Sequence, residues 1–339
     1  MMGLVGKGVS LAAVLSLACA PVAAAPRNAP PPVAEAFVCP VLHNEFHGYV
    51  VPIAPRQDYE PKPAMWKIAD ADTVIHVFGT YHSLPEGFRW RTALFDKVVA
   101  EAKEVVFESR DEDPIAEDGA VSAEEQRYID AVARHAAAVP LSQRVSPGNR
   151  AKLAQLFKLA GVKPADMDLL PPVVIMFAID AISSEAEGSV QDFGVETVIE
   201  KEFRDSGRPI SAIEDPVAVL ESLLAIDDSQ IVTMIDAGLD EWDGCALADP
   251  ATTDWSTQQS WAQGKIDDDE IAEMGDEPFE KAFYEAIVVN RNRAWAGWLE
   301  ERMKQPGNLL LAVGAAHMEG PDSVLLMLEK RGIKAERVQ

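Results

Sequence analysis

Positive charge is scarce in this 339-residue chain, which carries 30 Lys and Arg residues against 55 Asp and Glu residues. The formal net charge of −25 at pH 7 leaves too few basic residues for a face that binds nucleic acid or anionic lipid. The sequence therefore argues against both as main partners, and the excess of acidic residues favours solubility.

Cysteine is also rare, since the chain has only Cys19, Cys39 and Cys245. They form no Cys-x-x-Cys pair, which excludes a zinc site built from thiolates. Cys19 lies in an N-terminal leader, so the sequence is compatible either with a disulfide between Cys39 and Cys245 or with two separate thiols. Gly-x-Ser-x-Gly and Gly-rich phosphate loops are missing too, which disfavours a nucleophilic serine hydrolase and a phosphate-binding protein.

Long hydrophobic runs are confined to the N-terminus. Residues 1–25 combine Lys7, a short apolar run and an Ala-rich end, the pattern of a cleaved secretory signal peptide. We therefore predict a periplasmic or secreted protein; the alternative, a lipoprotein anchored at Cys19, requires Leu where Ser16 stands. The next most apolar segment, residues 169–182, contains a Pro pair and Asp180, which predicts a core helix and no membrane span.

The order of apolar patterns predicts an α/β fold with some α+β character. After a Pro-rich extension, residues 26–64, we expect one domain over residues 65–339. A strand at 72–78, a helix at 87–102 and a strand at 103–109 form a βαβ unit. Three more strands are predicted at the segments 208–213, 308–314 and 333–338. The result is a small, mostly parallel sheet that carries a large helical insertion at about 111–305.

Two predicted strands end in the same short pattern, Gly-x-x-His. The first delivers His82, the second delivers His317, and a third strand ends at Glu108. Because ligands gather beyond the carboxyl ends of parallel strands, we expect these side chains to meet there. Two imidazoles and a carboxylate form a donor set for a divalent metal that leaves positions open for water. The alternative interpretation is structural, with each histidine hydrogen-bonded at the surface and Glu108 capping a helix.

A polar interruption marks the last long helical segment. Arg291 lies on a stripe formed by Ile287, Trp295 and Leu299, and Asn290 lies on the neighbouring row. A buried Arg291 could hold a carboxylate or stabilise negative charge on a substrate. An arginine that extends from the edge of the stripe to solvent fits the pattern as well.

Five segments together resemble the TraB/GumN family, which includes the Tiki proteases. The resemblance runs in order from about Ala64 to Val338. The segments are AMWKIADADTVIHVFGTYHSLP, KEVVFES, DFGVETVIEKEFRDSGRPISAIEDP, RNRAWAGWLEE and LLLAVGAAHMEGPDSVLLMLEKRGIKAERV. The resemblance implies a fold related to erythromycin esterase-like and ChaN-like proteins.

The resemblance also implies a metal-dependent hydrolase. His82, His317 and Glu108 would take the roles tied to metal-dependent peptide cleavage in Tiki proteins, and Glu196 and Arg291 match further family positions. We expect Mn²⁺, Co²⁺ or Zn²⁺ as cofactor, Glu108 as ligand or general base, and a peptide or small molecule as substrate.

Two other functions remain open on the same fold. One is a non-catalytic binding or signalling protein. The other is a haem-binding module that uses Tyr81 or one of the histidines at the sheet edge as its axial ligand.

Overall fold

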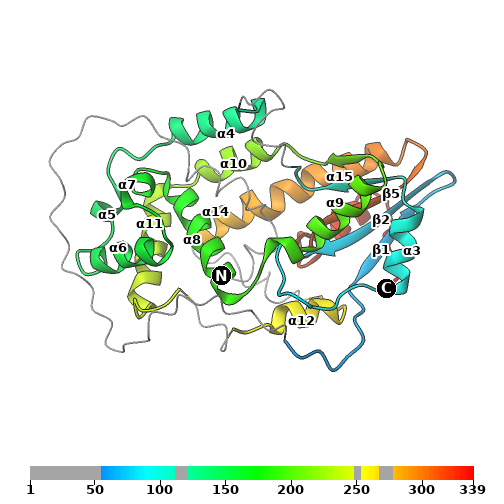
Figure 1. Ribbon diagram of the computed structural model, residues 1–339. Helices are drawn as coiled ribbons and strands as arrows, with labels where there is room; N and C mark the ends of the chain where they lie inside the picture. Colours follow the sequence, from blue (N-terminus) through cyan, green and yellow to red (C-terminus); the bar gives the residue numbers. More distant parts are fainter. Residues whose placement is uncertain (1–54, 111–120, 248–252, 267–277) are drawn as a thin grey trace.

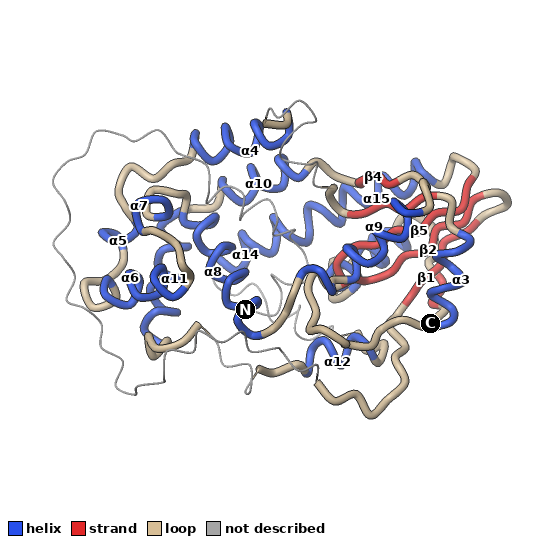
Figure 2. Tube along the Cα trace, in the orientation of Figure 1, coloured by secondary structure: helices blue, strands red, loops and turns tan. Residues whose placement is uncertain are grey.

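A computed structural model describes residues 55–110, 121–247, 253–266 and 278–339 (Figure 1). The predicted signal peptide, most of the Pro-rich extension and Cys39 lie outside the described residues. One end of the molecule holds a β-sheet with flanking helices, and the other end is a lobe made of helices alone (Figure 2).

The sheet is six-stranded and mixed, with the order β4-β3-β5-β2-β1-β6. Its strands are β1 (Met65–Ala69), β2 (Thr73–Thr80), β3 (Glu104–Phe107), β4 (Ile210–Ala212), β5 (Gly307–Gly314) and β6 (Glu336–Arg337). Strands β2 to β5 are paired in parallel, whereas β1 is antiparallel to both β2 and β6. The predicted α/β class and the mostly parallel pairing are confirmed, and β1 is a strand that the sequence pattern missed.

Helices cover both faces of the sheet. One face packs on α3 (Ala93–Glu101), α9 (Val195–Asp205) and α12 (Ser256–Ala262), and the other packs on α15 (Asn290–Arg302) and α16 (Val324–Glu329). Within β5, Leu310 and Ala312 face the first layer, whereas Leu309, Leu311 and Val313 face the second. A strand buried on both faces must be apolar at every position, which explains the continuous apolar run of β5.

The helix predicted over residues 87–102 begins only at Ala93. The side chain of Thr92 accepts a hydrogen bond from the backbone N–H of Phe95 at 3.1 Å and caps this helix. Phe88 and Trp90, which suggested an earlier start, are buried in irregular chain. Their apolar character therefore reflects burial and not helical periodicity.

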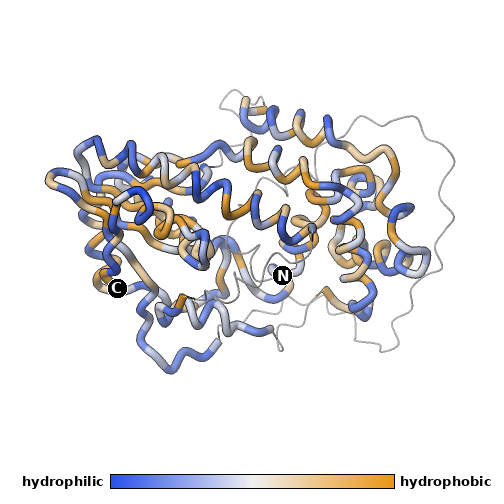
Figure 3. Tube along the Cα trace, turned by 180° about the vertical axis from the view of Figure 1, so that it is seen from behind, coloured by the Kyte–Doolittle hydropathy of each residue, from blue (hydrophilic) through white to orange (hydrophobic). Residues whose placement is uncertain are grey.

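The second end of the molecule, here called the helical lobe, has a hydrophobic core of its own. Its helices are α4 (Ala123–Arg134), α5 (Leu141–Arg144), α6 (Arg150–Leu159), α7 (Pro164–Met167), α8 (Pro172–Glu187), α10 (Pro216–Leu224), α11 (Asp228–Glu241) and α14 (Pro278–Tyr284). The segment predicted as a core helix forms α8, and hydrophobic residues recur along both the lobe and the strands (Figure 3). No helix within the described ranges is both long enough and apolar enough to span a bilayer.

A π-helical turn, η2 (Glu285–Val289), joins α14 in the helical lobe to α15 on the sheet. A π-helical turn contains more residues than an α-helical one, so it shifts which later side chains face the core. Asn290, expected on the apolar row, is exposed, whereas Arg291 and Asn292 are buried. This shift is the physical reason why the sequence periodicity pointed to the wrong asparagine. Two short 3-10 helices, η1 (Gln191–Phe193) and η3 (Ala315–Met318), complete the chain.

Candidate functional site

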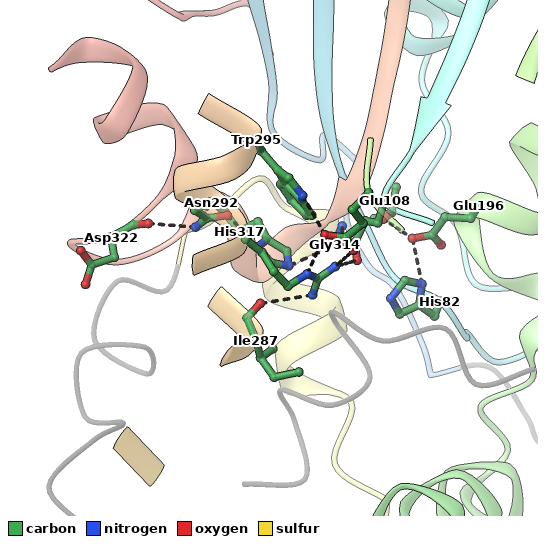
Figure 4. A network of polar contacts seen from close by, with 12 residues as sticks. His82, Glu108, Glu196, Ile287, Asn292, Trp295, Gly314, His317 and Asp322 are labelled. Atoms are coloured by element: carbon green, nitrogen blue, oxygen red, sulfur yellow. Dashed lines mark hydrogen bonds and ion pairs between the residues drawn. The ribbon is translucent and has the colours of Figure 1, made fainter. Parts of the chain in front are cut away.

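The carboxyl ends of the four parallel strands carry the polar residues of the candidate site. His82 follows β2, Glu108 follows β3, Glu214 follows β4 and His317 lies in η3 directly after β5. Because neighbouring parallel strands end at the same edge of a sheet, these side chains converge there, and Figure 4 shows His82, Glu108 and His317 close together. The sequence analysis expected His82, His317 and Glu108 to meet at this edge, and the strand topology explains why they do.

Small residues allow the segments at this edge to approach closely. A Cβ atom on Gly79 would lie 3.0 Å from the Cα of Ala315, so the two Gly-x-x-His turns are in contact. A Cβ atom on Gly194 would lie 1.9 Å from the carbonyl oxygen of His82, a distance that no side chain tolerates. The N-terminus of α9 therefore reaches the first turn, where the N–H of Val195 donates to the Tyr81 carbonyl at 2.9 Å.

His82 is held by a carboxylate from the first turn of α9. Its Nδ1 lies 3.0 Å from Oε1 of Glu196, and the Thr80 hydroxyl donates to the same oxygen. Burial alone would lower the pKa of His82, but the Glu196 carboxylate outweighs it and raises the pKa to about 9. Conversely, although burial opposes it, His82 holds the pKa of Glu196 below its ordinary value. Nε2 of His82 is buried and finds no hydrogen-bond partner in the described part of the chain.

His317 has a neutral partner and is fully buried. Its Nδ1 lies 2.7 Å from Oδ1 of Asn292, and its ring packs on Trp295 with centroids 4.1 Å apart. Nε2 lies 3.7 Å from Oε1 of Glu108, too far for a hydrogen bond, and meets no partner among the residues described. Burial, reinforced by the positive charges of Arg291 and His82, lowers the pKa of His317 well below its ordinary value.

Arg291 joins two carboxylates in the centre of the site. Its guanidinium contacts Glu214 through two bonds, Nε to Oε2 at 3.0 Å and Nη2 to Oε1 at 2.5 Å. Nη2 also contacts Oε2 of Glu108 at 2.5 Å, and Nη1 donates to the Ile287 carbonyl in the π-helical turn at 3.2 Å. The side chain is only 6% exposed, so the surface-arginine alternative is wrong and Arg291 holds carboxylates.

Glu108 is the most constrained acidic group of the site. The backbone N–H of Gly314 donates to its Oε1, while Oε2 faces Arg291. Burial raises the pKa of Glu108, and the positive charge of Arg291 opposes this increase. The carboxylate is therefore fixed in position by two elements far apart in the sequence, β5 and α15.

Sequence reasoning missed two partners in the site, Glu214, which is partly buried, and Asn292, which is fully buried. Glu214 lies after the third predicted strand, in the same position as Glu108 after its own strand, and this parallel could have identified it. Asn292 had no usable signal, because the π-helical turn moves it onto the buried face. Tyr81, the alternative haem ligand, is buried with its ring 5.1 Å from that of Trp261.

The site opens to one pocket on the side of α9. His82 and Glu108 line it, together with Glu196 and Glu200 from α9. The other lining residues are Phe107, Ser109, Arg110, Gln191 and Thr197. His317 and Arg291 do not line this pocket, so they lie behind the groups that a ligand would meet first.

The donor atoms can be compared with the needs of a metal ion. In the described residues, no three His, Cys, Asp or Glu side chains are grouped closely enough to hold a metal as they stand. The chemistry of the donors nevertheless fits, because His82 and His317 each bind a fixed partner through Nδ1 and leave a buried Nε2 without one. Ligating histidines show this arrangement, in which the second ring nitrogen bonds a carboxylate or another oxygen.

The fold and the site together define a mixed α/β protein in which paired Gly-x-x-His turns meet a buried Glu–Arg–Glu cluster at the ends of parallel strands. The model of the TraB/PrgY/gumN family matches residues 64–337, and the chain belongs to this family. Neither curated proteins nor solved structures gave a match. The family predicted from the sequence is confirmed, whereas the relation to erythromycin esterase-like and ChaN-like folds stays a prediction.

Proposed function

We propose that this protein is an exported, metal-dependent hydrolase of peptidase type that acts at the edge formed by β2, β5 and β3. One observation carries the proposal. Two imidazoles from the neighbouring parallel strands β2 and β5 lie near Glu108, and each has Nδ1 engaged while its buried Nε2 atom stays without a partner among the described residues. Export rests on the predicted signal peptide, residues 1–25, and the N-terminal residue of the mature protein, measured by mass spectrometry, tests it.

In this proposal His82 and His317 hold a divalent ion, Mn²⁺, Co²⁺ or Zn²⁺, through their Nε2 atoms. Such an ion, when bound, lowers the pKa of water and polarises a carbonyl group. Glu196 and Asn292 orient the two rings from their Nδ1 sides. These contacts would keep both rings in place before a ligand arrives, and His82, which is charged in the metal-free protein, would release its Nε2 hydrogen on binding an ion.

Glu108 acts in this proposal as a further ligand or as the general base. It lines the pocket, so a substrate entering beside α9 reaches it directly. The Gly314 N–H and Arg291 fix its two oxygens, and a fixed carboxylate is suited to accept a proton from a nearby water. Arg291 contributes by holding Glu108 and Glu214 in position rather than by contacting the substrate.

The decisive experiment measures metal content and peptide cleavage on the same protein. Chelator-treated protein is supplied with Mn²⁺, Co²⁺ or Zn²⁺, and cleavage of a peptide mixture is followed by mass spectrometry. We expect stoichiometric metal in the wild type, loss of metal in His82→Ala and His317→Ala, and a cleavage rate about 100-fold or more lower in Glu108→Gln.

The matched control is His135→Ala. His135 ends α4 and contacts the Ala131 carbonyl through Nδ1 at 2.9 Å, away from the strand ends. This variant should keep both metal and activity. Equal cleavage by the wild type and Glu108→Gln, or full activity of the chelated protein, would contradict the proposal.

One contact favours a second candidate, a non-catalytic binding protein on the same fold. Arg291 already places a buried positive charge beside Glu108 and Glu214. A site neutralised in this way can be stable without an added cation. Binding of small peptides with no cleavage under any of the three metals would favour this candidate.

A further inference from the structure

Asn292 is completely buried in α15 and makes three polar contacts through its side-chain amide. Nδ2 donates to the carbonyl of Asp322 at 2.8 Å and to the carbonyl of His317 at 3.3 Å. Oδ1 lies 2.7 Å from Nδ1 of His317, as Figure 4 shows. One side chain therefore binds both the backbone and the ring of the same histidine.

These contacts permit only one orientation of the amide. If the amide were flipped, its oxygen would face two carbonyl oxygens, and none of the three could donate a hydrogen. The two carbonyls therefore require the NH₂ group on their side, which leaves Oδ1 facing the imidazole. Because Oδ1 only accepts hydrogen bonds, Nδ1 of His317 must carry the hydrogen of this contact.

His317 is in surroundings that favour a neutral ring. It is fully buried, Arg291 contacts the same Glu108 carboxylate that Nε2 faces at 3.7 Å, and Nε2 has no hydrogen-bond partner in the residues that the structure describes. A neutral imidazole has one N–H, so a hydrogen on Nδ1 leaves a lone pair on Nε2.

We propose that Asn292 is a positioning residue that locks His317 in the Nδ1–H tautomer and thereby turns the Nε2 lone pair toward Glu108. The alternative tautomer would place a hydrogen on Nε2, 3.7 Å from the Glu108 carboxylate, which attracts donors. Without Asn292, a small movement would close this distance and the imidazole would lose its free lone pair. Asn292 therefore competes against Glu108 for the ring hydrogen.

The tautomer itself is independent of the proposed hydrolase, whereas the use of the lone pair as a metal ligand rests on that function. The two turns differ in this respect. Nδ1 of His82 faces the carboxylate of Glu196, which favours a charged ring with hydrogen on both nitrogens. Only His317 is given a single defined tautomer by a neutral partner.

The test is long-range ¹H–¹⁵N NMR of the full chain, labelled with ¹⁵N-histidine and kept metal-free with a chelator. The signals of His317 are assigned by their loss in His317→Gln. We expect the Nδ1–H pattern in the wild type and a shift toward Nε2–H in Asn292→Ala. Asn292→Asp should instead give a charged ring with hydrogen on both nitrogens, because its carboxylate would face Nδ1 as Glu196 faces Nδ1 of His82.

Asn308→Ala is the matched control, because Asn308 lies within β5 at the end of the strand opposite His317 and bonds the Glu101 carbonyl. It should leave the His317 pattern unchanged. An Nε2–H pattern in the wild type, or an unchanged pattern in Asn292→Ala, overturns the inference. If Asn292→Ala does not fold, the wild type still decides, because an Nε2–H pattern there overturns the inference.

A second measurement separates this inference from the proposed function. Titration with Mn²⁺ should show binding about 10–100-fold weaker in Asn292→Ala than in the wild type, the usual effect of losing the partner of a ligating histidine. A wild type that shows the Nδ1–H tautomer but binds no Mn²⁺ supports the inference and contradicts the metal site.

Discussion

The two Gly-x-x-His turns share one sequence pattern, yet they hold their histidines in opposite ways. The first turn presents His82 to the carboxylate of Glu196, while the second presents His317 to the amide of Asn292. The pKa of His82 rises to about 9 and that of His317 falls well below its ordinary value. The comparison teaches that spacing brings an imidazole to the sheet edge, but its charge depends on whether a carboxylate at Nδ1 offsets the cost of burial.

The surroundings of the two turns increase this difference. His82 lines the pocket beside α9, whereas His317 is fully buried behind it against Trp295. The turn that reaches the pocket therefore carries the charged ring, and the fully buried turn carries the neutral one. This arrangement follows the general rule that an unpaired charge is costly to bury.

The largest expected effect on stability comes from replacing Arg291. Its positive charge opposes the increase in the pKa of His82 and contributes to the decrease in the pKa of His317. Arg291→Met would leave the carboxylates of Glu108 and Glu214 buried without their cation. We expect a loss of about 3–5 kcal/mol in the free energy of unfolding, measured by urea denaturation.

The control for this change lies on the same helix. Arg293 is exposed and its partner is the side chain of Asn290, so Arg293→Met should cost less than about 1 kcal/mol. Equal stability of the two arginine variants would contradict the prediction that Arg291 stabilises the fold by neutralising Glu108 and Glu214.

The pH dependence of stability tests the comparison directly. A folded pKa raised from 6.5 to about 9 makes His82 stabilising below pH 6.5, and this contribution is lost as the pH rises to about 9. The loss is at most about 3 kcal/mol and should disappear in Glu196→Gln, measured on metal-free protein. His317, with its lowered pKa, should act in the other direction and lose its contribution as the pH falls below 6.5.

A decline in stability above pH 6.5 that is the same in Glu196→Gln and in the wild type would show that the carboxylate does not control His82. A profile without any decline below pH 6.5 in protein that retains His317 would show that its burial has no such effect. Either result would remove the contrast between the turns.

Gly194→Ala should disturb only the first turn, because its added Cβ would collide with the His82 carbonyl. We expect a loss of about 1–3 kcal/mol, typical of overpacking, measured by thermal or urea unfolding. The NMR tautomer of His317 should stay unchanged in the same protein. A change at both histidines would mean that the turns are mechanically coupled, which the contact of Gly79 with Ala315 makes a real alternative.

Gly238→Ala is the matched glycine control. Gly238 lies in α11 and a Cβ there meets nothing within 4 Å, so alanine should be neutral or stabilise the helix by about 1 kcal/mol. A similar loss in both glycine variants would point to a general effect of alanine and not to the approach of α9.

Much of the fold could be predicted because its signals are local. The strands that contain His76 and Val106 are apolar runs bounded by polar residues, and β5 is an uninterrupted run, as expected for strands covered on both faces. β1 was missed because Lys67 interrupts its apolar residues, and only its pairing with β2 identifies it as a strand. The helix expected from Gly87 was drawn too long because buried aromatic residues precede it.

The part of the candidate site that follows from the order and direction of the strands was predicted from the sequence. Parallel strands end together, so His82, Glu108 and His317 were expected at one edge, and they lie there. Glu214 and Asn292 were missed because their importance depends on contacts across the fold. The π-helical turn before α15 changes which face is buried, and no regular helical period anticipates it.

From its residues alone, this chain reveals its family, its α/β class and the place of two histidines after two apolar strands, because each follows from a local pattern. The folded structure was needed to learn that Glu196 charges one histidine while burial keeps the other neutral beside Asn292. Arg291 meets Glu108 across 183 positions of the chain, and Asn292 meets His317 across 25. Charge and tautomer depend on such distant neighbours and on burial, which sequence order does not encode directly.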